Sequence, residues 1–127
     1  MIYGLGIDLV RVDRIARALA RHGQRFLERL YTPQEIAYCQ GRHRQGAYQL
    51  AQRFAAKEAF SKALGVGLRR GGIRWREVEV VPDRMGKPEL RVTGRAAELC
   101  AAAGISNMLL SLTDEADYAA AVVILER

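Results

Sequence analysis

Three charged side chains stand out as candidates for chemistry: a glutamate, a lysine and an aspartate. Glu58 and Lys62 lie four residues apart in the segment 53–65, which is rich in helix-forming residues and has no proline or glycine before its last position. Side chains four residues apart share one face of a helix, so a carboxylate and an ammonium would stand side by side. An exposed ion pair, worth only about 0.2–0.5 kcal/mol, would have the same pattern.

The same helix face carries three further candidates. At 100° per residue, Phe54, Ser61 and Gly65 fall beside the glutamate and the lysine. The opposite face carries small, aliphatic and aromatic side chains that can pack into a core, namely Ala56, Phe60, Ala63 and Leu64. We therefore expect a helix with a buried back and a front that forms the walls of a site.

The aspartate, Asp8, lies in a β-rich apolar segment, residues 1–10. Strand alternation places it on the same side as Ile2, Gly4 and Gly6. Glycines beside a lone carboxylate leave room for another group to approach the backbone closely. An aspartate that caps a neighbouring turn at the end of a strand is the alternative.

Two carboxylates and a lysine suit a magnesium–phosphate site better than other metal or nucleophile chemistry. Mg²⁺ keeps several waters and often binds through one or two carboxylates together with substrate phosphates. Asp8 and Glu58 could supply those oxygens if the strand packs beside the helix, and Lys62 could neutralise phosphate charge. The chain has no Cys/His spacing for zinc, no P-loop and no complete dinucleotide fingerprint, and it suggests no Ser-His-Asp or Cys-His set.

A second charged feature lies in residues 11–26, which have the pattern of an amphipathic helix with a break expected near Gly23. Four arginines share its polar face: Arg14, Arg17, Arg21 and Arg25. Like charges one turn apart repel each other, so a ridge of one sign indicates an acidic partner. A solvated charged face is the alternative.

The order of elements predicts an α+β fold in one domain, residues 1–127. A strand is followed by several helices, a hairpin at 77–93, a helix at 93–103, and strands at 107–112 and 117–125 joined by an acidic turn at 113–116. The central helix begins near residue 47 and ends at Gly65. We expect a mostly antiparallel sheet packed against this long central helix.

Composition narrows the possible partners. The net charge of +6 and pI of about 9.8 favour an anionic partner: nucleic acid, a phosphorylated cofactor or an acidic protein. Aromatic residues make up only 7%, with no nucleic-acid recognition motif, so a nucleic-acid-binding module rests on charge alone. No apolar run is long enough to span a membrane, and no signal peptide is recognised. Cys39 and Cys100 are expected to be buried and reduced in a cytoplasmic protein.

Several short motifs together resemble the holo-acyl-carrier-protein synthases, the short bacterial 4′-phosphopantetheinyl transferases, from end to end of the chain. The motif in the central helix is highly specific, whereas the hairpin turn alone would be weak. The motifs are Gly4-x-Gly6-Ile7-Asp8 followed by Arg14-Ile15, Arg53-Phe54-Ala55-Ala56-Lys57-Glu58-Ala59-x-x-Lys62-Ala63-x-Gly65, Gly86-Lys87-Pro88, and Ser111-Leu112-Thr113 before Tyr118-Ala119-Ala120-Ala121-Val122.

The resemblance implies a fold, a reaction and partners. The family fold is the 4′-phosphopantetheinyl transferase fold. Such enzymes move the phosphopantetheine arm of coenzyme A onto a serine of apo acyl-carrier protein, an acidic protein of fatty acid biosynthesis, and release adenosine 3′,5′-bisphosphate. Short members are homotrimers with active sites at subunit interfaces. A carrier-protein binder without turnover is the non-catalytic alternative.

The resemblance also implies roles for individual residues. Asp8 and Glu58 would bind Mg²⁺, and Glu58 and Lys62 would be catalytic. The segments expected to contact coenzyme A supply Phe54, Ser61, Lys62, Gly65, Gly86, Lys87 and Pro88. Arg14 and Arg21 match family positions that bind the carrier protein, whereas Arg17 and Arg25 rest on helical geometry alone. Many members have His where this chain has Asp114, which we expect to cap the acidic turn rather than reach the metal; the base that deprotonates the acceptor serine is left open.

Overall fold

A computed structural model describes residues 1–68 and 72–127 of the chain. Its elements in chain order are β1 (Ile2–Arg11), α1 (Val12–His22), α2 (Gln24–Leu30), α3 (Pro33–Cys39), the short 3₁₀ turn η1 (His43–Gly46), α4 (Ala47–Leu64), the 3₁₀ turn η2 (Trp75–Glu77), β2 (Val78–Pro82), β3 (Pro88–Val92), α5 (Gly94–Ala102), β4 (Asn107–Glu115) and β5 (Tyr118–Glu126). This is the expected α+β class.

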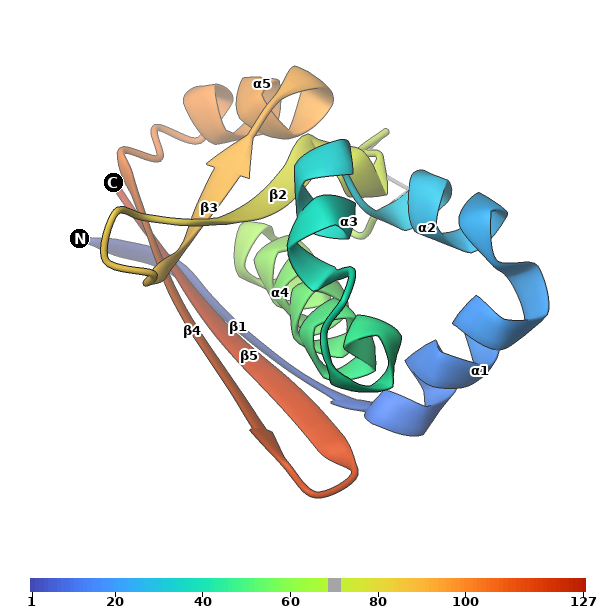
Figure 1. The fold of residues 1–127 in the computed structure, drawn as a ribbon. Coiled ribbons are helices and arrows are strands. Elements are labelled where there is room, and N and C mark those ends of the chain that lie inside the picture. The colour runs from blue at the N-terminus through green and yellow to red at the C-terminus, as the bar shows by residue number, and fades with distance from the viewer. Residues whose placement is uncertain (69–71) are drawn as a thin grey trace.

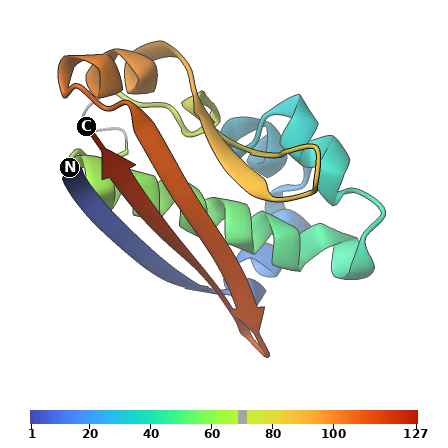
Figure 2. The ribbon, with the colours of Figure 1, turned by 90° about the vertical axis from the view of Figure 1, so that its left-hand side faces the viewer.

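The strands form two antiparallel sheets. β1, β5 and β4 make a three-stranded sheet in that order, while β2 and β3 pair as a separate ribbon. The helix α4 lies along the inner face of the three-stranded sheet (Figures 1 and 2). α1, α3 and β2 pack on its other sides, and β3 contacts β4 at the edge of the sheet. The predicted packing of an antiparallel sheet against a long central helix is confirmed.

Two glycines explain how closely the strand and the helix pack. A Cβ at Gly4 would lie 1.9 Å from the backbone oxygen of Ala63, and one at Gly6 would lie 1.9 Å from that of Ala59. No side chain fits in such a gap, so β1 can contact the α4 backbone only where it has glycine. The predicted alternation is correct, and Asp8 follows the two glycines on this inner face.

The helix ends agree with the sequence signals. Gly23 separates α1 from α2 with φ at 55°, and Gly65 ends α4 in the left-handed conformation. Thr32 forms a full capping box with Glu35 at the start of α3. Thr93 stands at the N-cap position of α5 but makes no side-chain cap hydrogen bond. Cys39 and Cys100 are free and buried, as expected.

One expectation about the fold is wrong. Residues 113–115 belong to β4, and the turn before β5 consists of Ala116 and Asp117, because Thr113, Asp114 and Glu115 pair with β5. The front of α4 is largely covered, since Phe54 and Ser61 are buried together with the back of the helix. The three-stranded sheet covers one side of α4, and α1, α3 and β2 pack on other sides.

Candidate functional site

Asp8, Glu58 and Lys62 come together where β1 lies along α4. The ammonium nitrogen of Lys62 is 3.2 Å from Oδ1 of Asp8 and 3.0 Å from the backbone oxygen of Ile7. Asp8 keeps only 15% of its side chain exposed, against 54% for Lys62. The expected position of Asp8 beside the helix is therefore correct. Lys62 contacts the aspartate of the strand, and no hydrogen bond or ion pair joins it to Glu58 within the described residues.

The two carboxylates are held where charge is unfavourable. Burial raises the pKa of Asp8, and the Lys62 ammonium only partly offsets this effect. Burial also raises the pKa of Glu58, and the negative charge of Asp8 raises it further. Arg14 and Lys62 oppose both shifts. Two half-buried carboxylates that repel each other are an arrangement that a bound cation would stabilise.

The donor set fits magnesium rather than a dedicated metal cage. No group of three or more His, Cys, Asp or Glu side chains that could hold a metal occurs within residues 1–68 and 72–127. Asp8 and Glu58 would leave most positions around a cation to water and substrate oxygens, which is how Mg²⁺ is usually bound at phosphate sites.

A cavity of about 530 Å³ opens beside Glu58. The rings of Phe54 and Trp75 form an aromatic wall, with ring centroids 5.1 Å apart and planes 21° apart. The guanidinium carbon of Arg14 lies 5.2 Å from the Phe54 centroid. The remaining lining comes from α1 and α2, and includes His22, Arg25, Phe26, Arg29 and Leu30. We call this space the Glu58 pocket.

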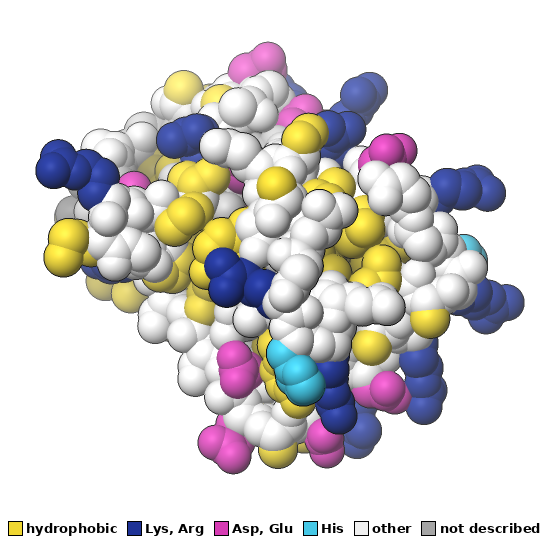
Figure 3. Space-filling model, in the orientation of Figure 1, with side chains coloured by type: hydrophobic (Ala, Val, Ile, Leu, Met, Phe, Trp, Pro, Cys, Tyr) yellow, Lys and Arg dark blue, Asp and Glu magenta, His cyan; other side chains and the backbone are white. Residues whose placement is uncertain are grey.

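The predicted arginine ridge is divided between two helices. Arg14, Arg17 and Arg21 are exposed on α1, whereas Arg25 lies on α2, beyond the break at Gly23. Arg14 and Arg25 nevertheless line the same pocket. Arg17 forms an exposed ion pair with Asp13 at 2.9 Å. Lys and Arg side chains project from the side of the molecule formed by α1 and α2 (Figure 3).

The hairpin turn lies apart from this pocket. Gly86 and Pro88 line a cavity of about 210 Å³ with Arg53, and Lys87 and Pro88 line another of about 570 Å³ between β3 and β4. Neither cavity is lined by Glu58 or Lys62. One chain therefore does not bring the two parts of the expected coenzyme A site into one pocket.

Sequence reasoning missed two residues of these cavities. Arg53 is 3% exposed, its guanidinium lies 4.2 Å from the Tyr38 centroid, and its Nε has no hydrogen-bond partner within the described residues. Trp75 forms half of the aromatic wall. An arginine within a largely apolar helix and the only tryptophan of the chain were the available signals.

Asp114 has a contact that the sequence did not predict. Its carboxylate accepts a hydrogen bond of 2.6 Å from the side-chain amide of Gln52 on α4. Because Asp114 belongs to β4, it does not cap the turn as expected.

Comparison with known proteins identifies the class to which this fold and site belong. Residues 4–123 match the model of the 4′-phosphopantetheinyl transferase superfamily. The chain is similar to holo-[acyl-carrier-protein] synthases of Geotalea daltonii, at 47% identity over the full length of both chains, and of Halorhodospira halophila, at 50% over 98% of each.

Solved structures show the same likeness. The holo-[acyl-carrier-protein] synthase of Neisseria meningitidis has a TM-score of 0.89 and 40% identity over all of both chains. The Helicobacter pylori synthase, in complex with coenzyme A, has a TM-score of 0.84 and 30% identity over 96% of this chain and 99% of that chain. This chain therefore belongs to the holo-[acyl-carrier-protein] synthase family and is an enzyme of the phosphopantetheinyl transferase class. No helix in the described part of the chain is long and apolar enough to cross a membrane.

Proposed function

We propose that this enzyme transfers the 4′-phosphopantetheine group of coenzyme A to a serine of apo acyl-carrier protein, and that Asp8, Glu58 and Lys62 form the centre of its site. The serine oxygen forms a bond to the β-phosphorus, the bond from that phosphorus to the bridging oxygen breaks, and adenosine 3′,5′-bisphosphate leaves. The observation that carries the proposal is the convergence of the three side chains at the edge of an arginine-lined pocket.

Each side chain has a distinct part in this proposal. Asp8 and Glu58 hold Mg²⁺, which when bound supplies Lewis-acid catalysis and a template for the pyrophosphate. Lys62, more than half exposed, turns its ammonium toward the phosphate and stabilises charge that develops there. The base that accepts the serine proton is Glu58 or a water bound at the same site.

Coenzyme A requires more surface than one pocket supplies. We propose that Phe54, Ser61 and Gly65 contact it near the reacting phosphates, and that the turn Gly86-Lys87-Pro88 contacts its adenine end. Because the turn lies apart from Glu58 in one chain, we infer that the turn of one subunit meets the Asp8, Glu58 and Lys62 site of another.

The outer face of β1 supports a homotrimer. Leu5, Ile7 and Leu9 each expose more than 60% of their surface in the single chain. A row of exposed aliphatic side chains on an edge strand marks an interaction surface rather than a solvated one. We propose that copies of the chain cover it, in a cytoplasmic enzyme of fatty acid biosynthesis.

One assay tests the reaction directly. The chain is incubated with apo-carrier protein, coenzyme A and Mg²⁺, and mass spectrometry detects the added phosphopantetheine. We expect Asp8→Asn and Glu58→Gln each to lower the rate by at least about 100-fold, and chelation of divalent cations to do the same. Glu98→Gln, an exposed carboxylate on α5, is the matched control and keeps the wild-type rate. Near-wild-type transfer by either site variant in excess Mg²⁺ would show the metal assignment to be wrong.

Charge reversal tests carrier-protein binding by Arg14, Arg17, Arg21 and Arg25. Arg14→Glu or Arg21→Glu should raise the apparent KM for carrier protein by roughly tenfold and leave that for coenzyme A nearly unchanged, because the acidic partner meets α1. Arg91→Glu on β3, away from α1, is the matched control (Figure 1). An equal rise in both KM values would contradict the assignment of α1 to the carrier protein.

A further inference from the structure

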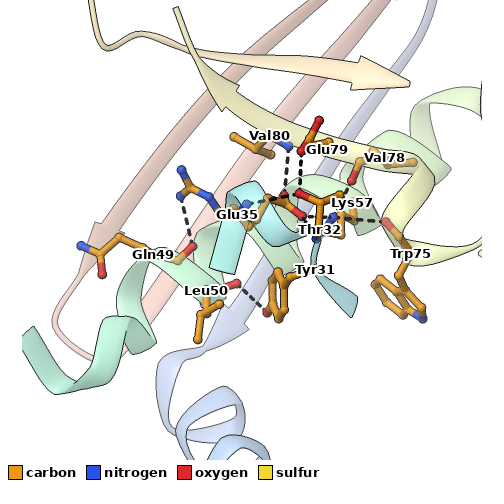
Figure 4. Close-up of polar contacts among 11 residues, drawn as sticks. Tyr31, Thr32, Glu35, Gln49, Leu50, Lys57, Trp75, Val78, Glu79 and Val80 are labelled. Atoms are coloured by element: carbon orange, nitrogen blue, oxygen red, sulfur yellow. Dashed lines mark hydrogen bonds and ion pairs between the residues drawn. The ribbon is translucent and has the colours of Figure 1, made fainter. Parts of the chain in front are cut away.

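A buried ion pair joins α3 to α4, and its lysine also contacts the backbone of Trp75, which lines the Glu58 pocket (Figure 4). Lys57 and Glu35 are both fully buried, and the ammonium nitrogen is 2.8 Å from Oε1 of the carboxylate. The same ammonium donates to the backbone oxygens of Trp75, at 3.1 Å, and Val78. All three donors of the lysine are therefore used, and two of them hold the backbone of the segment that carries Trp75.

The carboxylate extends the network on its other side. Oε2 of Glu35 accepts from the backbone N–H of Val80 at 3.0 Å, and Oε1 also accepts from that of Thr32 at 3.0 Å. The Thr32 hydroxyl in turn donates to Glu79. One ion pair thus fixes the start of β2, the turn η2 and the first turn of α3 against α4 (Figure 4).

Stability alone does not account for this pair. Burial lowers the pKa of the Lys57 ammonium, and the Glu35 carboxylate opposes that shift, so burying this charged pair carries a desolvation cost. Buried ion pairs can often be replaced by apolar residues without loss of stability, because the desolvation cost offsets the attraction. An apolar pair, however, cannot donate hydrogen bonds to the backbone oxygens of Trp75 and Val78.

The position of the Trp75 ring depends on that backbone. The indole Nε1 is buried and has no hydrogen-bond partner within residues 1–68 and 72–127, so no bond of its own fixes the ring. The ring is located by its stacking on Phe54 and by the anchored backbone behind it. Lys57 and Glu58 are neighbours on α4. The Lys57 ammonium therefore contacts the backbone of Trp75 and Val78, while the Glu58 carboxylate lines the pocket.

We propose that Lys57 and Glu35 are positioning residues that act through Trp75: they hold Trp75, the half of the aromatic wall to which no coenzyme A contact is assigned, in the position that receives the carrier protein. The proposal rests on the carrier-protein role given above to the arginines of this pocket. Lys57 and Glu35 themselves touch no substrate, so their loss changes carrier-protein recognition and leaves the transfer step intact.

The test uses the double variant Glu35→Gln/Lys57→Met, which removes both charges and leaves no unpaired buried ion. Trp75 is the only tryptophan, so its fluorescence reports on the wall directly. Below the unfolding temperature, we expect a shifted emission maximum and at least about twofold stronger acrylamide quenching. The KM for carrier protein should rise about tenfold, with kcat and the KM for coenzyme A changing less than about twofold.

Two comparisons separate positioning from general destabilisation. Leu125→Ala removes a fully buried side chain from β5, outside the network, and should change neither the tryptophan signal nor the KM for carrier protein. In a Trp75→Ala background, Glu35→Gln/Lys57→Met should raise the KM for carrier protein by less than about twofold, because the ring through which the pair acts is already absent.

Each possible failure has its own meaning. An unchanged tryptophan signal, the same changes in Leu125→Ala, or a full additional rise in the Trp75→Ala background would overturn the proposal. If the pair variant does not fold, Glu35→Gln alone is measured in the same way, and failure of both to fold would show that the pair serves folding instead. If the wild-type chain transfers no phosphopantetheine, the proposed function fails, while the quenching result still decides whether the pair holds Trp75.

Discussion

Replacement of Gly6 by alanine should separate β1 from α4 and thereby damage both stability and catalysis. The added Cβ would lie 1.9 Å from the backbone oxygen of Ala59 and 2.8 Å from the backbone nitrogen of Ala63. Ordinary contacts between non-bonded atoms are above 3 Å, so the strand and helix must move apart by at least about 1 Å. Both obstructing atoms are backbone atoms, and no change of side-chain rotamer relieves the clash.

The cost follows from the packing around the clash. Overpacking in a core typically costs about 1–3 kcal/mol, and a clash between two backbones belongs at or above the upper end. A loss of about 3 kcal/mol would lower the midpoint of thermal unfolding by about 10 °C for a chain of this size. The same displacement moves Asp8 away from Glu58 and Lys62, and a misplacement of 1 Å can lower a rate by about 100-fold.

The assay combines thermal unfolding with the mass-spectrometric transfer assay at a temperature where Gly6→Ala is fully folded. Gly41→Ala is the control, because Gly41 has φ at 78° with no atom near its Cβ position, so alanine there costs only backbone strain of about 1–2 kcal/mol. Gly41→Ala should keep the transfer rate. A second change, Ala59→Gly, should not rescue Gly6→Ala, because the clash is with the Ala59 oxygen. Rescue by that change, or a Gly6→Ala variant with wild-type rate and stability, would refute the reasoning.

Three further outcomes are expected. Burial raises the pKa of Asp8 above 3.8, so the folded metal-free chain holds this proton more tightly than the unfolded chain and loses stability as pH rises through the raised pKa. In denaturant unfolding without metal, the free energy of unfolding should therefore fall less between pH 4 and pH 7 for Asp8→Asn than for wild type. An equal fall would contradict the raised pKa of Asp8. Burial raises the pKa of the Cys39 thiol to about 11, and Cys100 is also buried. A thiol reagent at about pH 8 should therefore label neither cysteine until the chain unfolds. Rapid labelling of the native chain would contradict this expectation. Leu5→Glu places a charge on the exposed face of β1 and should reduce the sedimenting mass to that of one chain, and an unchanged mass would exclude this face as the interface.

Local signals in the sequence predicted the elements that hold the site. Alternation in residues 1–10 placed Asp8 on the glycine side of its strand, and the structure places it there. Glycine was expected to break or end the helices at Gly23 and Gly65, and both helices end there. These features depend on a few neighbouring residues, so a single sequence is enough to predict them.

Contacts between distant segments could not be read in the same way. Lys57 is fully buried, and its partner Glu35 lies 22 positions away on another helix, so no local pattern indicates the pair. Phe54 and Ser61 share a helix face with Glu58, and the elements packed around α4 cover both side chains. Helical periodicity identifies which residues share a face, not how many faces the rest of the fold will cover.

The burial of α4 on most of its surface explains why it can carry a precise site. A helix with one solvated face can shift against its sheet, whereas α4 contacts β1 backbone to backbone at Gly4 and Gly6 and is tied to β2 through Lys57. Glu58 is therefore held by packing on two sides before any ligand binds. Binding then need not pay the entropy of ordering this carboxylate, and its position relative to Asp8 is set by backbone contacts. The same argument explains why Gly6→Ala, which lies outside the reacting groups, is expected to lower the rate as well as the stability.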